Sequence, residues 1–81
     1  MFDLFILIRK WAEARNLIKG ATPAAQFEKL MEEVGELGRA LIENDDTKFV
    51  DAVGDVIVVL TILAAQKDYS TEECIAHAYN Q

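Results

Sequence analysis

The chain has 81 residues, of which 52% are hydrophobic and 27% are charged, so it is long enough for one small folded domain and too apolar to be disordered. Fourteen Asp and Glu residues against eight Lys and Arg residues give a formal net charge of −6. This charge disfavours nucleic acid or an anionic membrane as the main partner, and it favours cations or a substrate that arrives with one.

Punctuation residues divide the first half of the chain into two predicted helices. The first helix covers about residues 2–18 and ends at Gly20, which we place just beyond its C-terminus. The second helix has Thr22 as its N-cap and Pro23 in its first turn, and it continues to about Glu43.

Two further helices are predicted in the second half. The third has Asp46 as its N-cap and covers about residues 47–66. A strand over 56–60 is the main alternative, because β-branched residues dominate there, but the apolar run continues without a turn signal and is too long for a typical strand. The fourth helix begins with a capping box formed by Ser70 and Glu73 and continues through Tyr79.

These elements predict one all-α domain over residues 1–81, a subunit that resembles a four-helix bundle with three long helices and a shorter C-terminal one. Residues 56–63 make the third helix apolar around nearly its whole circumference. Three neighbouring helices of so small a subunit can hardly enclose it, so we expect it to pack against another subunit. A monomer with an exposed apolar patch is the alternative.

The remaining composition bears on the cellular location. Cys74 is the single cysteine and cannot form an intrachain disulfide, which favours a reducing compartment, and we expect a cytoplasmic protein. The first three residues lack the basic region of a signal peptide. The longest apolar stretch, residues 56–65, is about half of a membrane span, so we expect no membrane insertion.

Carboxylates lie beside an apolar stripe on the second predicted helix. We take that stripe as the core side; it comprises Phe27, Leu30, Met31, Val34, Gly38, Leu41 and Ile42. Glu33 and Glu36 lie on one flank of it, together with Gln26, Lys29 and Ala40, and Glu32 lies further from the core.

The third predicted helix carries Asp51 and Asp55 on the stripe that continues to Val58 and Ile62. If the two helices form an antiparallel hairpin, Glu33 and Glu36 reach a similar depth to these two aspartates. Carboxylates so close together either take up protons or bind a cation, and an oxygen-only ligand set suits Mg²⁺ or Mn²⁺. The alternative is an ordinary acidic helix face that forms salt bridges to Lys29, Arg39 and Lys48.

Two short segments carry a family resemblance. Glu32-Glu33-Val34-Gly35-Glu36-Leu37 and Asp51-Ala52-Val53-Gly54-Asp55-Val56 resemble the MazG-like all-α nucleoside triphosphate pyrophosphohydrolases, whose pattern is Glu-x-x-Glu, a spacer, and Glu-x-x-Asp. Glu33 and Glu36 match the first pair and Asp55 matches the final Asp. Ala52 stands where the pattern has Glu, and Asp51 lies one position earlier. The resemblance covers most of the chain from about Trp11 onward.

The resemblance implies Mg²⁺-dependent hydrolysis of a (deoxy)nucleoside triphosphate to the monophosphate and pyrophosphate, in a homo-oligomer for which a tetramer is favoured over a dimer. The residues expected to serve this reaction are Glu33, Glu36, Asp51 and Asp55 as metal ligands, Glu32 as the base, and Gln26, Lys29 and Asn80 in substrate binding. Lys29 has an alternative role as an ion-pair partner of Glu33.

Other interpretations stay open at the level of sequence. Ala52 favours a catalytically inactive helical oligomer that acts as an interaction module. Trp11 fits a core position better than a position stacked on a base. His77 lacks a second His or a Cys at ligand spacing, so we expect it on the surface or in an interface.

Overall fold

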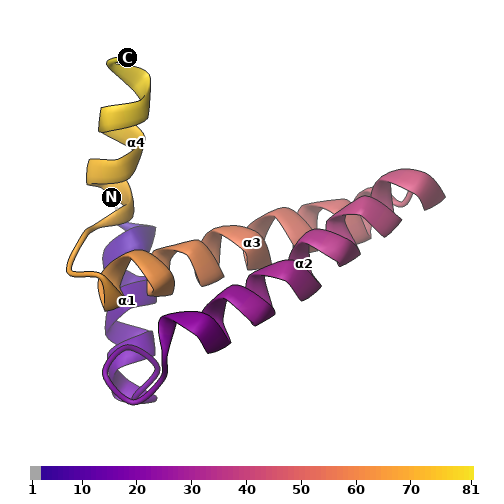
Figure 1. Cartoon of the computed structure of the whole chain (residues 1–81). Helices are drawn as coiled ribbons and strands as arrows, with labels where there is room; N and C mark the ends of the chain where they lie inside the picture. The colour runs from indigo at the N-terminus through magenta and orange to yellow at the C-terminus, as the bar shows by residue number, and fades with distance from the viewer. Residues whose placement is uncertain (1–2) are drawn as a thin grey trace.

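The computed structural model describes residues 3–81, and within that range the chain is all-helical, as predicted (Figure 1). Its four helices are α1 (Leu4–Ala14), α2 (Pro23–Glu43), α3 (Asp46–Gln66) and α4 (Thr71–Tyr79). Position 2, where the first helix was expected to begin, lies outside the described residues.

Capping explains most helix boundaries. The Thr22 side chain accepts a hydrogen bond from the backbone N–H of Ala25, and Pro23 lies in the first turn of α2, as predicted. The capping box of Ser70 and Glu73 at the start of α4 is also confirmed.

Two predicted boundaries are wrong. Helix α1 ends at Ala14 rather than Ile18, because Asn16 takes the left-handed conformation (φ 55°) and Gly20 is not its terminator. The N-cap of α3 is Asp45 rather than Asp46, and its side chain accepts a hydrogen bond from the backbone N–H of Lys48. Asn44, also left-handed at φ 54°, closes α2 immediately before it, so the connection is one residue shorter than expected.

Helices α2 and α3 form a long antiparallel hairpin, and α1 and α4 contact α3 near the open end of that hairpin (Figure 1). The tip around Asn44 projects away from both, so the four helices of the bundle-like subunit do not pack along their whole length. Its radius of gyration is 13.5 Å, whereas a compact domain of this length has a value of about 12 Å.

Polar contacts hold the open end together. The Arg9 guanidinium donates two hydrogen bonds, of 2.7 and 3.1 Å, to the carboxylate of Glu72, which joins α1 to α4. The Gln66 side-chain amide donates to the backbone carbonyl of Leu17 at 3.2 Å. Thr61 is fully buried in α3, and its hydroxyl donates to the carbonyl of Ile57.

The buried side of α2 differs from the prediction. Leu30, Glu33 and Ala40 are its buried residues, whereas most of the apolar stripe that we took as the core side is exposed. We call the exposed surface the apolar side of the hairpin; it consists of Phe27, Met31, Val34 and Leu41 of α2 with Phe49 and Leu60 of α3. At 100° per residue in two antiparallel helices, these residues share one side of the hairpin, and Glu36 lies on the other.

The apolar character of α3 is therefore only partly buried within the subunit. Ala52, Val59 and Ile62 face α2, and Ile57 and Leu60 are about 40% exposed. Among residues 3–81, α3 is the one helix whose length and composition would permit it to cross a membrane, a property that core helices of soluble proteins share.

Candidate metal centre and flanking cavities

Three carboxylates converge midway along the hairpin. Glu33 and Glu36 of α2 and Asp55 of α3 each offer one oxygen, and these oxygens all lie within 4.8 Å of one another. The predicted convergence of carboxylates from two helices is thus present for these three residues, which we call the carboxylate cluster. Glu33 and Glu36 are one turn apart on α2, and Asp55 is on the side of α3 that faces them.

Glu33 is the buried member of the cluster. Its side chain is 6% exposed, and one carboxylate oxygen lies 3.2 Å from the ammonium group of Lys29. The other oxygen, Oε2, is buried and has no hydrogen-bond partner among residues 3–81. A buried charged oxygen that lacks a partner is costly, and a cation in the cluster would satisfy it. The oxygen-only ligand set fits Mg²⁺ or Mn²⁺.

The electrostatics at Asp55 also favour a bound cation. Burial, followed by the negative charges of Asp51 and Glu33, raises the pKa of Asp55 above its ordinary value. The hydrogen bond to Glu33 raises the pKa of Lys29, so this ammonium group stays protonated. Lys29 therefore offsets one of the clustered negative charges and leaves the remainder for a bound cation.

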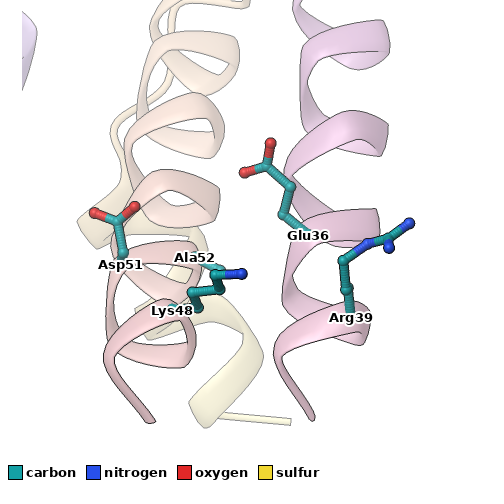
Figure 2. Close-up of a pocket in the computed structure, with 5 residues that line it drawn as sticks. All are labelled: Glu36, Arg39, Lys48, Asp51 and Ala52. Atoms are coloured by element: carbon teal, nitrogen blue, oxygen red, sulfur yellow. The ribbon is translucent and has the colours of Figure 1, made fainter. Parts of the chain in front are cut away.

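Not every predicted site residue joins the cluster. Asp51 is outside it, and in Figure 2 its carboxylate points along α3 rather than toward Glu36. Glu32 is 68% exposed and lies 3.7 Å from Lys29. Asn80 is the exposed C-cap of α4 and lines neither of the cavities described below. The structure thus brings three of the four predicted ligands together.

A cavity of about 470 Å³ opens on one side of the cluster. Its polar lining comes from Gln26, Lys29, Glu33 and Asp55, so Gln26 and Lys29, for which we predict a substrate-binding role, both border a cavity next to the cluster. The remaining lining residues are Trp11, Leu17, Val58, Val59 and Ile62. We call it the first cavity.

Trp11 is a correction to the sequence interpretation. It is 45% exposed at the first cavity rather than in the core, and the guanidinium of Arg15 lies 5.1 Å from the centre of its ring. Ala12 rather than Trp11 is the residue that α1 buries, so the ring of Trp11 stays at the surface.

A second cavity, of about 390 Å³, lies on the other side of the cluster, toward the tip of the hairpin (Figure 2). It is lined by Glu36, Arg39, Lys48, Asp51 and Ala52. Sequence analysis considered Arg39 and Lys48 only as ion-pair partners on an acidic face. Lys48 does pair with Glu43, at 3.4 Å, but it also borders this cavity.

Comparison with known proteins agrees with this geometry. Residues 12–80 match the family model described as phosphoribosyl-ATP pyrophosphohydrolase. The chain belongs to the phosphoribosyl-ATP pyrophosphohydrolase family. This family is a relative of the MazG-like enzymes within one all-helical superfamily, so the resemblance was correct at that level, although the MazG family itself is not the one matched.

Enzymes of the phosphoribosyl-ATP pyrophosphohydrolase family generally depend on a divalent metal, and the carboxylate cluster is a possible site for such an ion. One relative is an uncharacterized 18.2 kDa protein from the rep-hol intergenic region of Haemophilus phage HP1, which is 49% identical over 69 residues. That match covers 82% of this chain and 42% of the phage protein, so the chain spans less than half the length of this relative. No solved structure gives a significant match.

Proposed function

We propose that this chain hydrolyses a (deoxy)nucleoside triphosphate to the monophosphate and pyrophosphate with the help of Mg²⁺. The observation that carries the proposal is the carboxylate cluster, in which an oxygen of each of Glu33, Glu36 and Asp55 lies within 4.8 Å of the others. The unpartnered oxygen of Glu33 gives the cluster a reason to bind a cation.

Each group has a distinct role in this proposal. Glu33, Glu36 and Asp55 hold the ion, which supplies positive charge against the phosphate oxygens when it is bound. Lys29 pairs with Glu33 and contacts a phosphate from the first cavity. Glu32 is exposed beside Lys29 and outside the cluster, and we assign its carboxylate to accept the proton of the attacking water because it is not committed to the ion.

The first cavity suits the nucleoside. Trp11 offers a half-exposed aromatic ring, and stacking of a base on such a ring stabilises binding by about 1–3 kcal/mol. Gln26 supplies an amide that both donates and accepts hydrogen bonds at a base or sugar edge. We therefore place the base beside Trp11 and the phosphates at the carboxylate cluster.

We also propose that the active form is a homo-oligomer, with a tetramer favoured over a dimer. The support is the apolar side of the hairpin, on which Phe27, Leu41 and four further large residues are 37–63% exposed. An apolar surface of this size suits burial against a second copy of the chain better than contact with water. Asn80, which is remote from the cluster within one subunit, then has a route to the substrate of a neighbouring subunit.

A substrate panel tests the reaction. The purified chain is incubated with each nucleoside triphosphate, each deoxynucleoside triphosphate and phosphoribosyl-ATP, with Mg²⁺ or with a chelator, and pyrophosphate is measured. We expect Mg²⁺-dependent release from at least one triphosphate. Preference for phosphoribosyl-ATP over all of them would overturn the substrate assignment and keep the reaction type, whereas no release from any compound would overturn both.

The base-binding role of Trp11 has its own test. Trp11→Ala is expected to raise KM for the preferred triphosphate by about 10-fold or more and to change kcat less, because it removes stacking and leaves the cluster intact. Trp11→Phe is the matched control and should recover most of the affinity. An unchanged KM in Trp11→Ala would place the base elsewhere.

A further inference from the structure

The second cavity lies directly beyond the carboxylate cluster. Glu33 and Asp55 line the first cavity and Glu36 lines the second, so the cluster stands between the two. We consider a substrate with its base in the first cavity and its phosphates at the cluster. The terminal phosphates of that substrate would then lie next to the second cavity.

Ala52 leaves room in this cavity. It is 3% exposed and faces α2, and it stands where the superfamily pattern carries a Glu. Its methyl group carries no charge, so this position adds no negative charge to the cavity. A Glu here would place a fourth carboxylate beside Glu36.

Lys48 brings positive charge to the same place. It is one turn before Ala52 on α3, and Figure 2 shows its ammonium group directed toward α2. Its ion pair with Glu43 joins two side chains that are 63% and 43% exposed, and such surface pairs are weak enough to exchange for a ligand. Arg39 is at the rim, with its guanidinium directed away from α3.

Charge balance indicates what Lys48 would bind. The three clustered carboxylates carry three negative charges, which one divalent ion and Lys29 neutralise. The terminal phosphates of a triphosphate then need further positive charge. The cavity next to the cluster offers it from Lys48 and Arg39, which outnumber its one carboxylate outside the cluster, Asp51.

We propose, building on the proposed function, that Lys48 binds the terminal phosphates of the substrate in the cavity over Ala52, assisted by Arg39. The chain thereby uses protein cations where the superfamily pattern places a fourth carboxylate. The second cavity is the site of the pyrophosphate leaving group, and the order along the hairpin is base, cluster, terminal phosphates.

Calorimetric titration with inorganic pyrophosphate and Mg²⁺ tests this placement without requiring turnover. We expect Lys48→Gln to weaken pyrophosphate binding by about 10-fold or more, since it removes a charge-assisted contact, and Arg39→Gln to weaken it less. Lys10→Gln, an exposed position on α1 that lines neither cavity, is the matched control and should bind like the wild type. Circular dichroism verifies that each variant is helical.

A second variant tests the same cavity at Ala52, which lines it. Ala52→Glu is expected to weaken pyrophosphate binding because its carboxylate fills the space and adds negative charge beside Glu36. The number of Mn²⁺ ions bound per chain, counted by electron paramagnetic resonance, should increase because a fourth carboxylate has joined the cluster.

The outcomes separate this inference from the proposed function. If the wild type releases pyrophosphate from a triphosphate and Lys48→Gln binds pyrophosphate as tightly as the wild type, the placement is wrong and the function stands. If wild-type binding depends on Lys48 and no triphosphate is hydrolysed, the function is wrong and the anion site stands. Failure of the wild type to bind pyrophosphate with Mg²⁺ overturns the placement.

Discussion

The two sides of the α2–α3 hairpin have opposite chemistry on the same pair of helices. One side gathers the carboxylates of Glu33, Glu36 and Asp55, and the other exposes apolar residues such as Phe27 and Val34. Both are unfavourable in an isolated chain, because one concentrates negative charge and the other exposes apolar surface to water. The comparison teaches that each side needs a different partner: a cation for the first and, in our proposal, a second copy for the other.

The largest expected effect is on the carboxylate side. Glu36→Gln keeps the size of an exposed side chain and removes one negative ligand, so we expect it to lower Mg²⁺-dependent pyrophosphate release by about 100-fold or more. Kinetic assay with the preferred triphosphate measures this loss. Glu28→Gln is an exposed control on the same helix and should retain activity; full activity in Glu36→Gln would remove this residue from the site.

A comparably sharp change on the apolar side should affect assembly. Val34→Asp places a charge on a surface that we assign to a neighbouring copy, and burial of an unpaired charge is costly. We expect the oligomer to dissociate over the concentration range in which the wild type is associated, as measured by analytical ultracentrifugation.

Glu36→Gln serves as the control for assembly, because it changes the opposite side of the same helix. It should sediment like the wild type. Identical sedimentation of Val34→Asp and the wild type would show that the apolar side is not the interface.

The sequence predicts those features of the two sides that depend on residues close together in the chain. Capping residues such as Thr22 and Ser70 act within one turn, so helix boundaries governed by them were predicted correctly. The spacing of Glu33, Glu36 and Asp55 also predicted their convergence, because a hairpin brings fixed helix faces together.

The apolar stripe of α2 was assigned to the wrong side for a physical reason. Periodicity shows that one side of a helix is apolar, but it does not say whether that side faces the same chain or another one. Trp11 was misplaced for a related reason, since helical spacing does not say which side of α1 packs on α3, and α1 buries Ala12 instead. The second cavity depends on Lys48 and Ala52 facing Glu36 across the hairpin, which requires the paired helices themselves.

A smaller effect is expected on the thermal stability of the metal-free protein, through Asp55 on the carboxylate side. Burial and neighbouring charges raise the pKa of Asp55, so ionised Asp55 destabilises the folded state. Without metal, stability should decrease as the pH rises from the ordinary value of 3.8 through the raised folded-state pKa, since the folded state retains the proton longer. Asp55→Asn should remove this dependence and raise the Tm of the metal-free protein at neutral pH by about 2–5 °C.

Mg²⁺ should reverse the order of the two Tm values, so that the wild type melts above Asp55→Asn. The wild type is expected to gain thermal stability when Mg²⁺ is added, because only its folded state holds the ion, and Asp55→Asn should gain little. Differential scanning calorimetry with and without Mg²⁺ gives both comparisons. A metal-free Asp55→Asn protein that melts below the wild type would contradict the interpretation that the cluster costs stability.

The smallest expected effect lies away from both sides, at the contact between α1 and α4. Arg9 donates two hydrogen bonds to Glu72 and lowers the pKa of that carboxyl, so the pair stabilises the fold above the ordinary Glu value of 4.5 and loses this contribution as the pH falls through the lowered pKa. Glu72→Gln should therefore melt slightly below the wild type at pH 7 and together with it in strong acid. Because both side chains are partly exposed, the shift is small and should shrink further in high salt. A difference in Tm that persists unchanged in acid would show that Glu72 acts through packing rather than through its charge.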